Sequence, residues 1–128
     1  MKKEKKNEKG DTKALEPLPI VRALFLALLK KYPGSSGYFM NKKIKDIFNE
    51  TVVLRSGTVY NELRKMEKMG LVRSLLEEKK RKVRKYSLTE KGEKELSRLK
   101  KMIKTRVEEI LVPLIEFMDN NGVKIDYE

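Results

Sequence analysis

The stretch of sequence that decides the fold is residues 54–92, which read LRSGTVYNELRKMEKMGLVRSLLEEKKRKVRKYSLTEKG. Its first part carries the signature of a helix. Ser56 is a candidate N-cap for that helix. Behind it, apolar side chains recur at intervals of four and three residues, at Val59, Leu63 and Met66. This spacing places them on one helix face, so the sequence predicts an amphipathic helix.

We expect this helix to span residues 57–69, with Gly70 ending it. Two short strand-like runs follow, at residues 71–76 and 83–88, and the loop between them, residues 77–82, is mostly cationic. A helix beside a hairpin with a basic tip is how a winged helix-turn-helix domain presents itself to a nucleic-acid duplex.

The same residues resemble the winged-helix core of the PadR family of transcriptional regulators, through SGTVYNELRKMEKMGLV and, after the hairpin, RKYSLTEKGEKEL. The residues that fall on the family's pattern are Gly57, Thr58, Tyr60, Leu63, Gly70, Leu71, Tyr86, Leu88, Thr89 and Gly92. Upstream, Gly37 and Tyr38 with Met40 and Ile44 resemble the start of the family's second helix. The resemblance spans roughly residues 20–100.

Two departures from the pattern bear on function. Asn61 stands where the family usually has Pro, which changes the chemistry of the recognition helix, and the wing lacks the Gly that often precedes its Arg-rich strand. The resemblance implies a homodimer formed through the C-terminal helices. It also leaves room for an effector ligand, because some members sense aromatic compounds between subunits. The chain has no Trp, so an aromatic clamp would consist of Tyr or Phe, and no stripe specifies one.

Composition bounds the function class. The 128 residues, 39% of them hydrophobic, suit one compact domain plus an accessory element. Lys and Arg number 31 against 19 Asp and Glu, and the net charge of +12 makes polyanions the natural partners. The absence of Cys and His removes thiol nucleophiles, disulfides and the commonest metal ligand. We therefore expect no enzyme, no cofactor and no metal site.

Three segments are expected along the chain. Residues 1–16 form a basic arm, either a solubilising tail or a DNA contact, because its start has almost no apolar side chains. Residues 17–92 form the winged helix-turn-helix domain, and residues 93–128 form the C-terminal helix and tail. The apolar run at 17–31, interrupted by Arg22, suits a buried first helix and is too short for a membrane span of about 20 residues. We expect a cytoplasmic protein without membrane contact.

The remaining local signals complete the fold class. Residues 32–37 read as a loop, residues 38–50 as a second helix and residues 51–55 as the turn between the second and third helices. The predicted fold is mostly α with a small β-hairpin, a winged helix-turn-helix, plus a long C-terminal dimerisation helix.

The candidate DNA-binding residues form an outward stripe on the third helix and a basic wing. On the helix, Arg can pair with guanine, Asn with adenine and Lys with phosphate, while a hydroxyl near the positive helix N-terminus can contact a phosphate. For any single residue, a solvated surface side chain remains the alternative. Tyr60, at the boundary, is expected to pack against the wing. The candidates are Ser56, Thr58, Asn61, Arg64, Lys65, Lys68, Lys79, Lys80, Arg81, Lys82 and Arg84.

A long final helix is expected behind an N-cap at Thr89, with a kink or break near Val112 caused by Pro113 and an end at residues 120–122. Its apolar stripe is too long for one small core to cover, which favours a dimer seam, although part of the stripe can pack on the first helix. Its polar side mixes both charge signs, unlike an interfacial membrane helix. The candidate dimerisation residues are Leu96, Leu99, Ile103, Val107, Ile110, Leu114 and Met118.

These observations indicate a sequence-specific DNA-binding transcriptional regulator, a dimeric repressor on a two-fold-related double-stranded DNA site. Two alternatives share the fold. A sequence-neutral architectural or chromatin protein would bind unrelated duplexes equally well. A winged helix used as a protein-interaction module would tolerate acidic substitutions on the basic stripe and wing.

Overall fold

The computed structural model describes residues 12–78 and 82–127. These residues fall into two compact units, one being Pro19–Leu99 and the other the described residues on either side of it. In chain order the elements are η1 (Thr12–Leu15), α2 (Ile20–Lys31), β1 (Ser35–Ser36), α3 (Gly37–Ile47), α4 (Ser56–Lys68), β2 (Val72–Glu78), β3 (Lys82–Leu88), α5 (Glu90–Arg106), η2 (Val107–Leu111) and α6 (Val112–Asn120).

The first long helix, α2, supplies the centre of the core. Phe25, Leu26 and Leu29 are almost wholly buried, and the helix packs on α3, α4 and β3. The prediction of a buried first helix is confirmed, although the helix begins at Ile20 instead of residue 17. Proline restricts the residue before it to extended conformations, so the helix cannot include the residue preceding Pro19.

The second helix, α3, is capped and tightly packed at its start. The Ser36 hydroxyl accepts a hydrogen bond from the Phe39 N–H at 3.1 Å. The helix ends at Ile47, earlier than the predicted residue 50, because Asn49 and Glu50 both adopt positive φ angles, of 53° and 65°. Left-handed residues cannot continue a right-handed helix, so they close it here.

The third helix, α4, buries the face that its sequence predicts. Val59, Leu63 and Met66 are at most 1% exposed. The prediction that Ser56 is the N-cap is wrong, because the preceding Arg55 is the extended residue whose carbonyl accepts the first helical N–H, at 3.1 Å. Without a side-chain capping bond, the helix simply begins one residue earlier.

The end of α4 follows its local signal. Gly70 has a φ of +78°, and the Leu71 N–H donates to the Met66 carbonyl at 2.9 Å, the geometry of a Schellman helix end. The predicted stop at Gly70 is confirmed.

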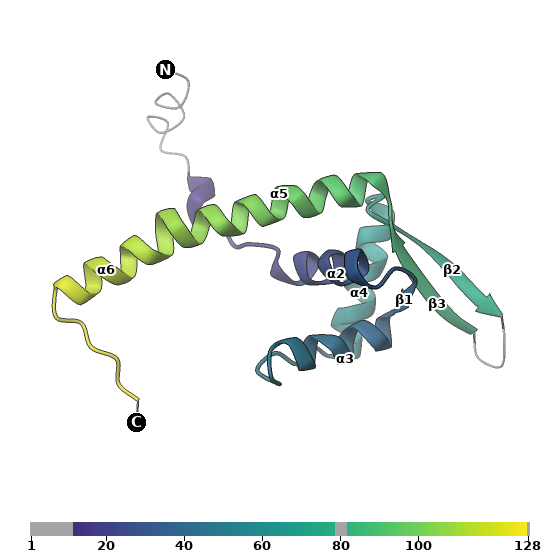
Figure 1. Ribbon diagram of the computed structural model, residues 1–128, viewed down its shortest axis with the longest axis horizontal. Coiled ribbons are helices and arrows are strands. Elements are labelled where there is room, and N and C mark those ends of the chain that lie inside the picture. Colours follow the sequence, from purple (N-terminus) through teal and green to yellow (C-terminus); the bar gives the residue numbers. More distant parts are fainter. Residues whose placement is uncertain (1–11, 79–81, 128) are drawn as a thin grey trace, which may run out of the picture. The chain divides into compact units, whose positions relative to one another are not determined.

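The wing is an antiparallel hairpin, β2 and β3, that projects from the helices (Figure 1). Both strands extend further toward the tip than predicted. A third strand lies within the expected loop at residues 32–37, since β1 pairs with β3 and gives the sheet order β1-β3-β2. A two-residue strand has no alternating pattern of its own, so only its pairing with β3 reveals it.

The start of α5 is locked to the end of α4. The Thr89 hydroxyl accepts the Gly92 N–H at 3.0 Å and donates to the Gly70 carbonyl at 2.6 Å, which confirms Thr89 as the cap. Gly92 lies directly against the Leu71 carbonyl, with no room for a Cβ. Further along α5, Leu99 is wholly buried.

One ion pair within the fold has a testable contribution to stability. Arg22, the lone charge in the apolar part of α2, donates through Nε to the Glu62 carboxylate of α4 at 3.2 Å, with side-chain exposures of 18% and 14%. Because removing one partner strands a poorly solvated charge, Arg22→Ala is expected to lower the free energy of unfolding by about 1–3 kcal/mol. The matched control is Lys30→Ala on the same helix, which breaks an exposed pair with Glu93 and should cost about 0.5 kcal/mol or less.

Urea unfolding of the two variants measures both values. Equal destabilisation by Arg22→Ala and Lys30→Ala would contradict a special role for the partly buried pair of Arg22 and Glu62.

The helix after Leu99 runs through residue 113 without a break. Of the predicted kink or break near Val112, the break does not occur, since the backbone stays helical and widens into the π turn η2, in which the Val112 N–H donates to the Val107 carbonyl. Pro113 has no N–H to donate to the carbonyl four residues earlier, and the change of hydrogen-bonding pattern lies directly before it. The helix ends at Asn120, as predicted.

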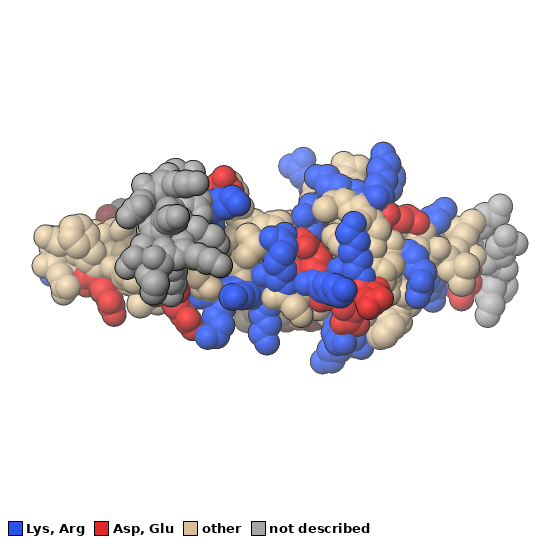
Figure 2. Space-filling view, turned by 90° about the horizontal axis from the view of Figure 1, so that it is seen from above, with Lys and Arg blue, Asp and Glu red and all other residues tan. Residues whose placement is uncertain are grey.

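Part of the expected N-terminal arm lies outside the described residues, and its last part contains η1. Within residues 12–78 and 82–127, no helix has the length and apolar character that crossing a membrane requires. On the face seen in Figure 2, Lys and Arg side chains intermingle with Asp and Glu side chains.

Candidate nucleic-acid interface

The outward face of α4 is exposed along its whole length. All six candidate residues on this helix are exposed: Ser56, Thr58, Asn61, Arg64, Lys65 and Lys68. The two acids of the helix are engaged by other elements. Glu62 pairs with Arg22, and Glu67 accepts a hydrogen bond from Ser74 at 2.7 Å. Glu62 is therefore neutralised by Arg22, whereas Glu67 keeps its negative charge beside the cationic face.

Asn61 and Arg64 form one unit on this face. The Arg64 Nη2 donates to the Asn61 Oδ1 at 2.6 Å. Since guanine reading needs two guanidinium donors in a fixed plane, this bond helps to orient Arg64. Reading of adenine by Asn61 stays a prediction, and it would require the same amide oxygen to serve a base.

Of the five candidate DNA-binding residues in the wing, Arg84 is the one whose side chain the structure describes. Lys79, Lys80 and Arg81 lie outside the described residues, as does the side chain of Lys82, whose backbone begins β3. Arg84 is exposed, and its Nη1 donates to the Ser74 hydroxyl at 2.9 Å.

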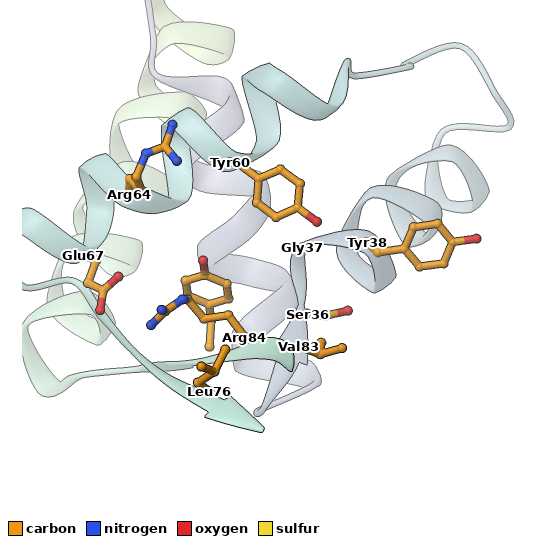
Figure 3. A pocket seen from close by; sticks show the side chains of 10 residues that line it. Ser36, Gly37, Tyr38, Tyr60, Arg64, Glu67, Leu76, Val83 and Arg84 are labelled. Carbon is orange, nitrogen blue, oxygen red and sulfur yellow. The ribbon is translucent and has the colours of Figure 1, made fainter. Parts of the chain in front are cut away.

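A cleft of about 820 Å³ separates α4 from the wing (Figure 3). Tyr60 and Arg64 line it from α4, Arg84 and Tyr86 from β3, and the start of α3 lines it near Ser36. Tyr60 lies at the edge of this cleft with its ring edge against Gly37 and is 42% exposed, so its packing against the wing stays a prediction. The cleft lies between the exposed face of α4 and the wing, and both apolar and charged side chains line it.

A chain of hydrogen bonds connects Arg84 and Glu67, which line the cleft from the wing and from α4. Arg84 donates to Ser74, and Ser74 donates to Glu67, so β3, β2 and α4 are connected in that order. Sequence reasoning missed this chain. The register pairs Ser74 with Tyr86 and Leu76 with Arg84, which places these side chains on one face of the hairpin. Strand alternation could have indicated that shared face.

Tyr86 is also a functional candidate that the sequence analysis did not assign to the interface. The residue is 3% exposed. Burial raises the pKa of its hydroxyl, Arg84 lowers it, and Glu67 raises it. The net upward pKa shift keeps the phenol protonated, so the hydroxyl remains a hydrogen-bond donor.

The predicted dimerisation residues differ in exposure. Leu99 is wholly buried within the Pro19–Leu99 unit, and Val107 and Leu114 are 42% and 49% exposed. The others are intermediate: Leu96, Ile103, Ile110 and Met118. Part of the stripe thus serves the fold of the single chain, as the alternative interpretation anticipates.

A three-helix core with an exposed third helix beside a β-hairpin defines a winged helix-turn-helix protein. A family model described as the transcriptional regulator PadR-like family matches residues 25–98, more than half of the chain. The chain therefore belongs to the PadR-like family of transcriptional regulators. A search of curated proteins finds no match.

Solved structures agree with this assignment. A transcriptional regulator from Clostridium thermocellum is 28% identical with a TM-score of 0.58, over 81% of this chain and 93% of that one. PadR of Bacillus subtilis in complex with operator DNA is 26% identical with a TM-score of 0.55, over 64% of this chain and 46% of that one. A PadR-like transcription factor from Bacteroides fragilis is 21% identical with a TM-score of 0.62, over 81% of this chain and 95% of that one. At this identity, the likeness supports the fold alone.

Proposed function

We propose that this protein is a dimeric regulator that binds a two-fold-related DNA site and represses transcription by occluding a promoter. The observation that carries the proposal is the exposed cationic face of α4 beside a cleft that Arg64 and Arg84 line from α4 and from the wing. The likeness to a PadR solved on its operator supports it. Occlusion requires only DNA binding, so repression is the simplest mode of action.

The chemistry of α4 supports sequence reading over simple charge attraction. Its exposed face carries Asn61 and Arg64, whose planar groups can each make two hydrogen bonds to a base edge in the major groove. Lys65 and Lys68 supply phosphate contacts on either side. A purely architectural protein would need only the lysines.

The second subunit is expected to cover the exposed apolar side chains after Arg106. Leu111, Ile115 and Phe117 are 44%, 53% and 66% exposed, which is unusual for a monomer. The π turn η2 also changes the seam. One extra residue in a turn rotates all later side chains by about 100°, so Leu111 and Ile115 continue the line of Val107 in place of Ile110 and Leu114.

Selection of bound duplexes from a random pool, followed by a salt titration, tests the proposal. A dimer should select two inverted half-sites spaced by about one helical turn, roughly 10 base pairs. Log affinity should fall with log salt by about one unit for each phosphate contacted.

The outcomes separate the alternatives. Enrichment of no sequence, with similar affinity for unrelated duplexes, would favour the architectural alternative. Selection of a single half-site would contradict the proposed dimer but would still support sequence-specific binding. Affinity that does not change with salt for every duplex would remove DNA binding altogether.

A further inference from the structure

The cleft between α4 and the wing lies where a DNA strand would have to pass. If α4 enters the major groove and the wing contacts the neighbouring minor groove, one phosphate backbone runs between them, because a backbone separates adjacent grooves. This step rests on the proposed function. The cleft opens between the same two elements, so the backbone would lie across its mouth.

The walls of the cleft carry hydrogen-bond donors suited to a phosphate. Arg64 lines the cleft from α4 and Arg84 lines it from β3 (Figure 3). The start of α3 adds Ser36 and Gly37, at a helix end whose free N–H groups favour anions. Three elements thus direct positive charge or N–H groups into one space.

The side chain of Tyr86 adds an unused donor. It is 97% buried by the sheet and helices, and no hydrogen bond of its hydroxyl lies within the described part of the chain. Tyr86 lines the cleft together with Arg84, Glu67 and Arg64, so its hydroxyl shares this space with both guanidinium-bearing side chains. Within the described residues, Asn41 Oδ1 is the buried side-chain atom without a partner, so the Tyr86 hydroxyl is accessible from the cleft and can donate to a ligand oxygen there.

We propose that the cleft holds one backbone phosphate of each DNA half-site, with the Tyr86 hydroxyl and the Arg84 guanidinium as its donors. The phosphate is bound independently of the base sequence and fixes how deeply α4 enters the major groove. Tyr86 is therefore a DNA-contacting residue in addition to the exposed stripe of α4.

Glu67 regulates this phosphate site. In the free protein, its carboxylate accepts from Ser74 at 2.7 Å, and Ser74 in turn accepts from Arg84 at 2.9 Å, which holds the guanidinium near the rim of the cleft. The same negative charge repels a phosphate. Glu67 thus has two effects: it keeps Arg84 in place, and it weakens binding of the DNA backbone. Specific DNA offsets this weakening through contacts along α4, whereas non-specific DNA does not, so Glu67 favours specific DNA.

The test combines a protein change with a DNA change at a single atom. Each phosphate of the selected duplex is replaced in turn by an uncharged methylphosphonate, and affinity is measured for the native protein and for Tyr86→Phe. In the native protein, one position per half-site should lose about 10-fold in affinity, as expected for a charge-assisted hydrogen bond. In Tyr86→Phe, the penalty at that position should shrink to about 3-fold or less.

Two controls accompany this experiment. Tyr32→Phe removes the same atom from a tyrosine outside the cleft and should leave every penalty unchanged. The thermal melting of Tyr86→Phe establishes that the variant is folded.

A second variant keeps the proposal testable if Tyr86→Phe does not fold. Glu67→Gln retains an acceptor for Ser74 and removes the charge, so it should tighten binding of the natural duplex about 3-fold and leave binding of the methylphosphonate duplex unchanged. Glu116→Gln on α6, with the same change in net charge, should alter neither.

Two results would overturn the phosphate site. In the first, methylphosphonate substitution lowers affinity equally for the native protein and Tyr86→Phe at every position. In the second, Glu67→Gln tightens binding of the natural duplex and of the methylphosphonate duplex by the same factor. Either result, obtained on a duplex that the native protein binds specifically, leaves the proposed function intact. Failure to bind any duplex would overturn both.

Discussion

Replacing Arg64 with Glu is expected to weaken binding of the selected duplex by about 100-fold or more. The change removes a base contact worth about 1–3 kcal/mol. It also adds a carboxylate to a face beside which Glu67 already carries a negative charge. Repulsion from the phosphates adds to the lost contact. Fluorescence anisotropy at moderate salt measures the effect.

The control is Lys101→Glu, which makes the same change in charge at an exposed position on α5. It should weaken binding by about 3-fold or less, because Lys101 belongs neither to the exposed face of α4 nor to the cleft. Similar losses in both variants would show that net charge alone governs binding. Arg64→Glu that still binds normally would support the protein-interaction alternative.

Asn61→Ala, measured beside Arg64→Glu, separates the two roles of the amide. If Asn61 reads adenine, the selected sequence should relax at one position of each half-site. An unchanged sequence preference would refute adenine reading and leave Asn61 as the partner that orients Arg64.

Replacing Gly92 with Ala is expected to lower the free energy of unfolding by about 2–4 kcal/mol. A Cβ at this position would collide with the Leu71 carbonyl and press on the Leu88 side chain. The carbonyl belongs to the backbone and cannot move aside without disturbing the Thr89 cap. Urea unfolding and the melting temperature measure the loss.

Gly57→Ala provides the matched control. Gly57 also lies in a helix, and a Cβ there would meet nothing within 4 Å. Since Ala is favoured over Gly in helices by about 1 kcal/mol at most, this variant should be as stable as the native protein or slightly more so. Equal losses at Gly57 and Gly92 would contradict the steric explanation.

Features set by short-range interactions were predictable from the sequence. The inward face of α4, the end of that helix at Gly70 and the cap at Thr89 each depend on residues within one or two turns. Errors in these features were also local. The predicted N-cap of α4 was Ser56 and the observed N-cap is Arg55, one residue earlier.

Features set by contacts between distant segments were not predictable. The bond between Arg22 and Glu62 joins residues 40 positions apart, and the chain from Glu67 through Ser74 to Arg84 depends on the register of the hairpin. Neither the packing of α2 on α4 nor that register is visible in a single sequence. The cleft exists only where these segments meet.

The sequence by itself determined that this chain presents a cationic helix beside a hairpin, because side-chain periodicity and helix-ending residues act locally. Only the tertiary structure decided which charges remain exposed and where Tyr86 directs its hydroxyl. Those properties arise when separate elements pack together, since burial and hydrogen bonding between segments change what each side chain offers to a partner.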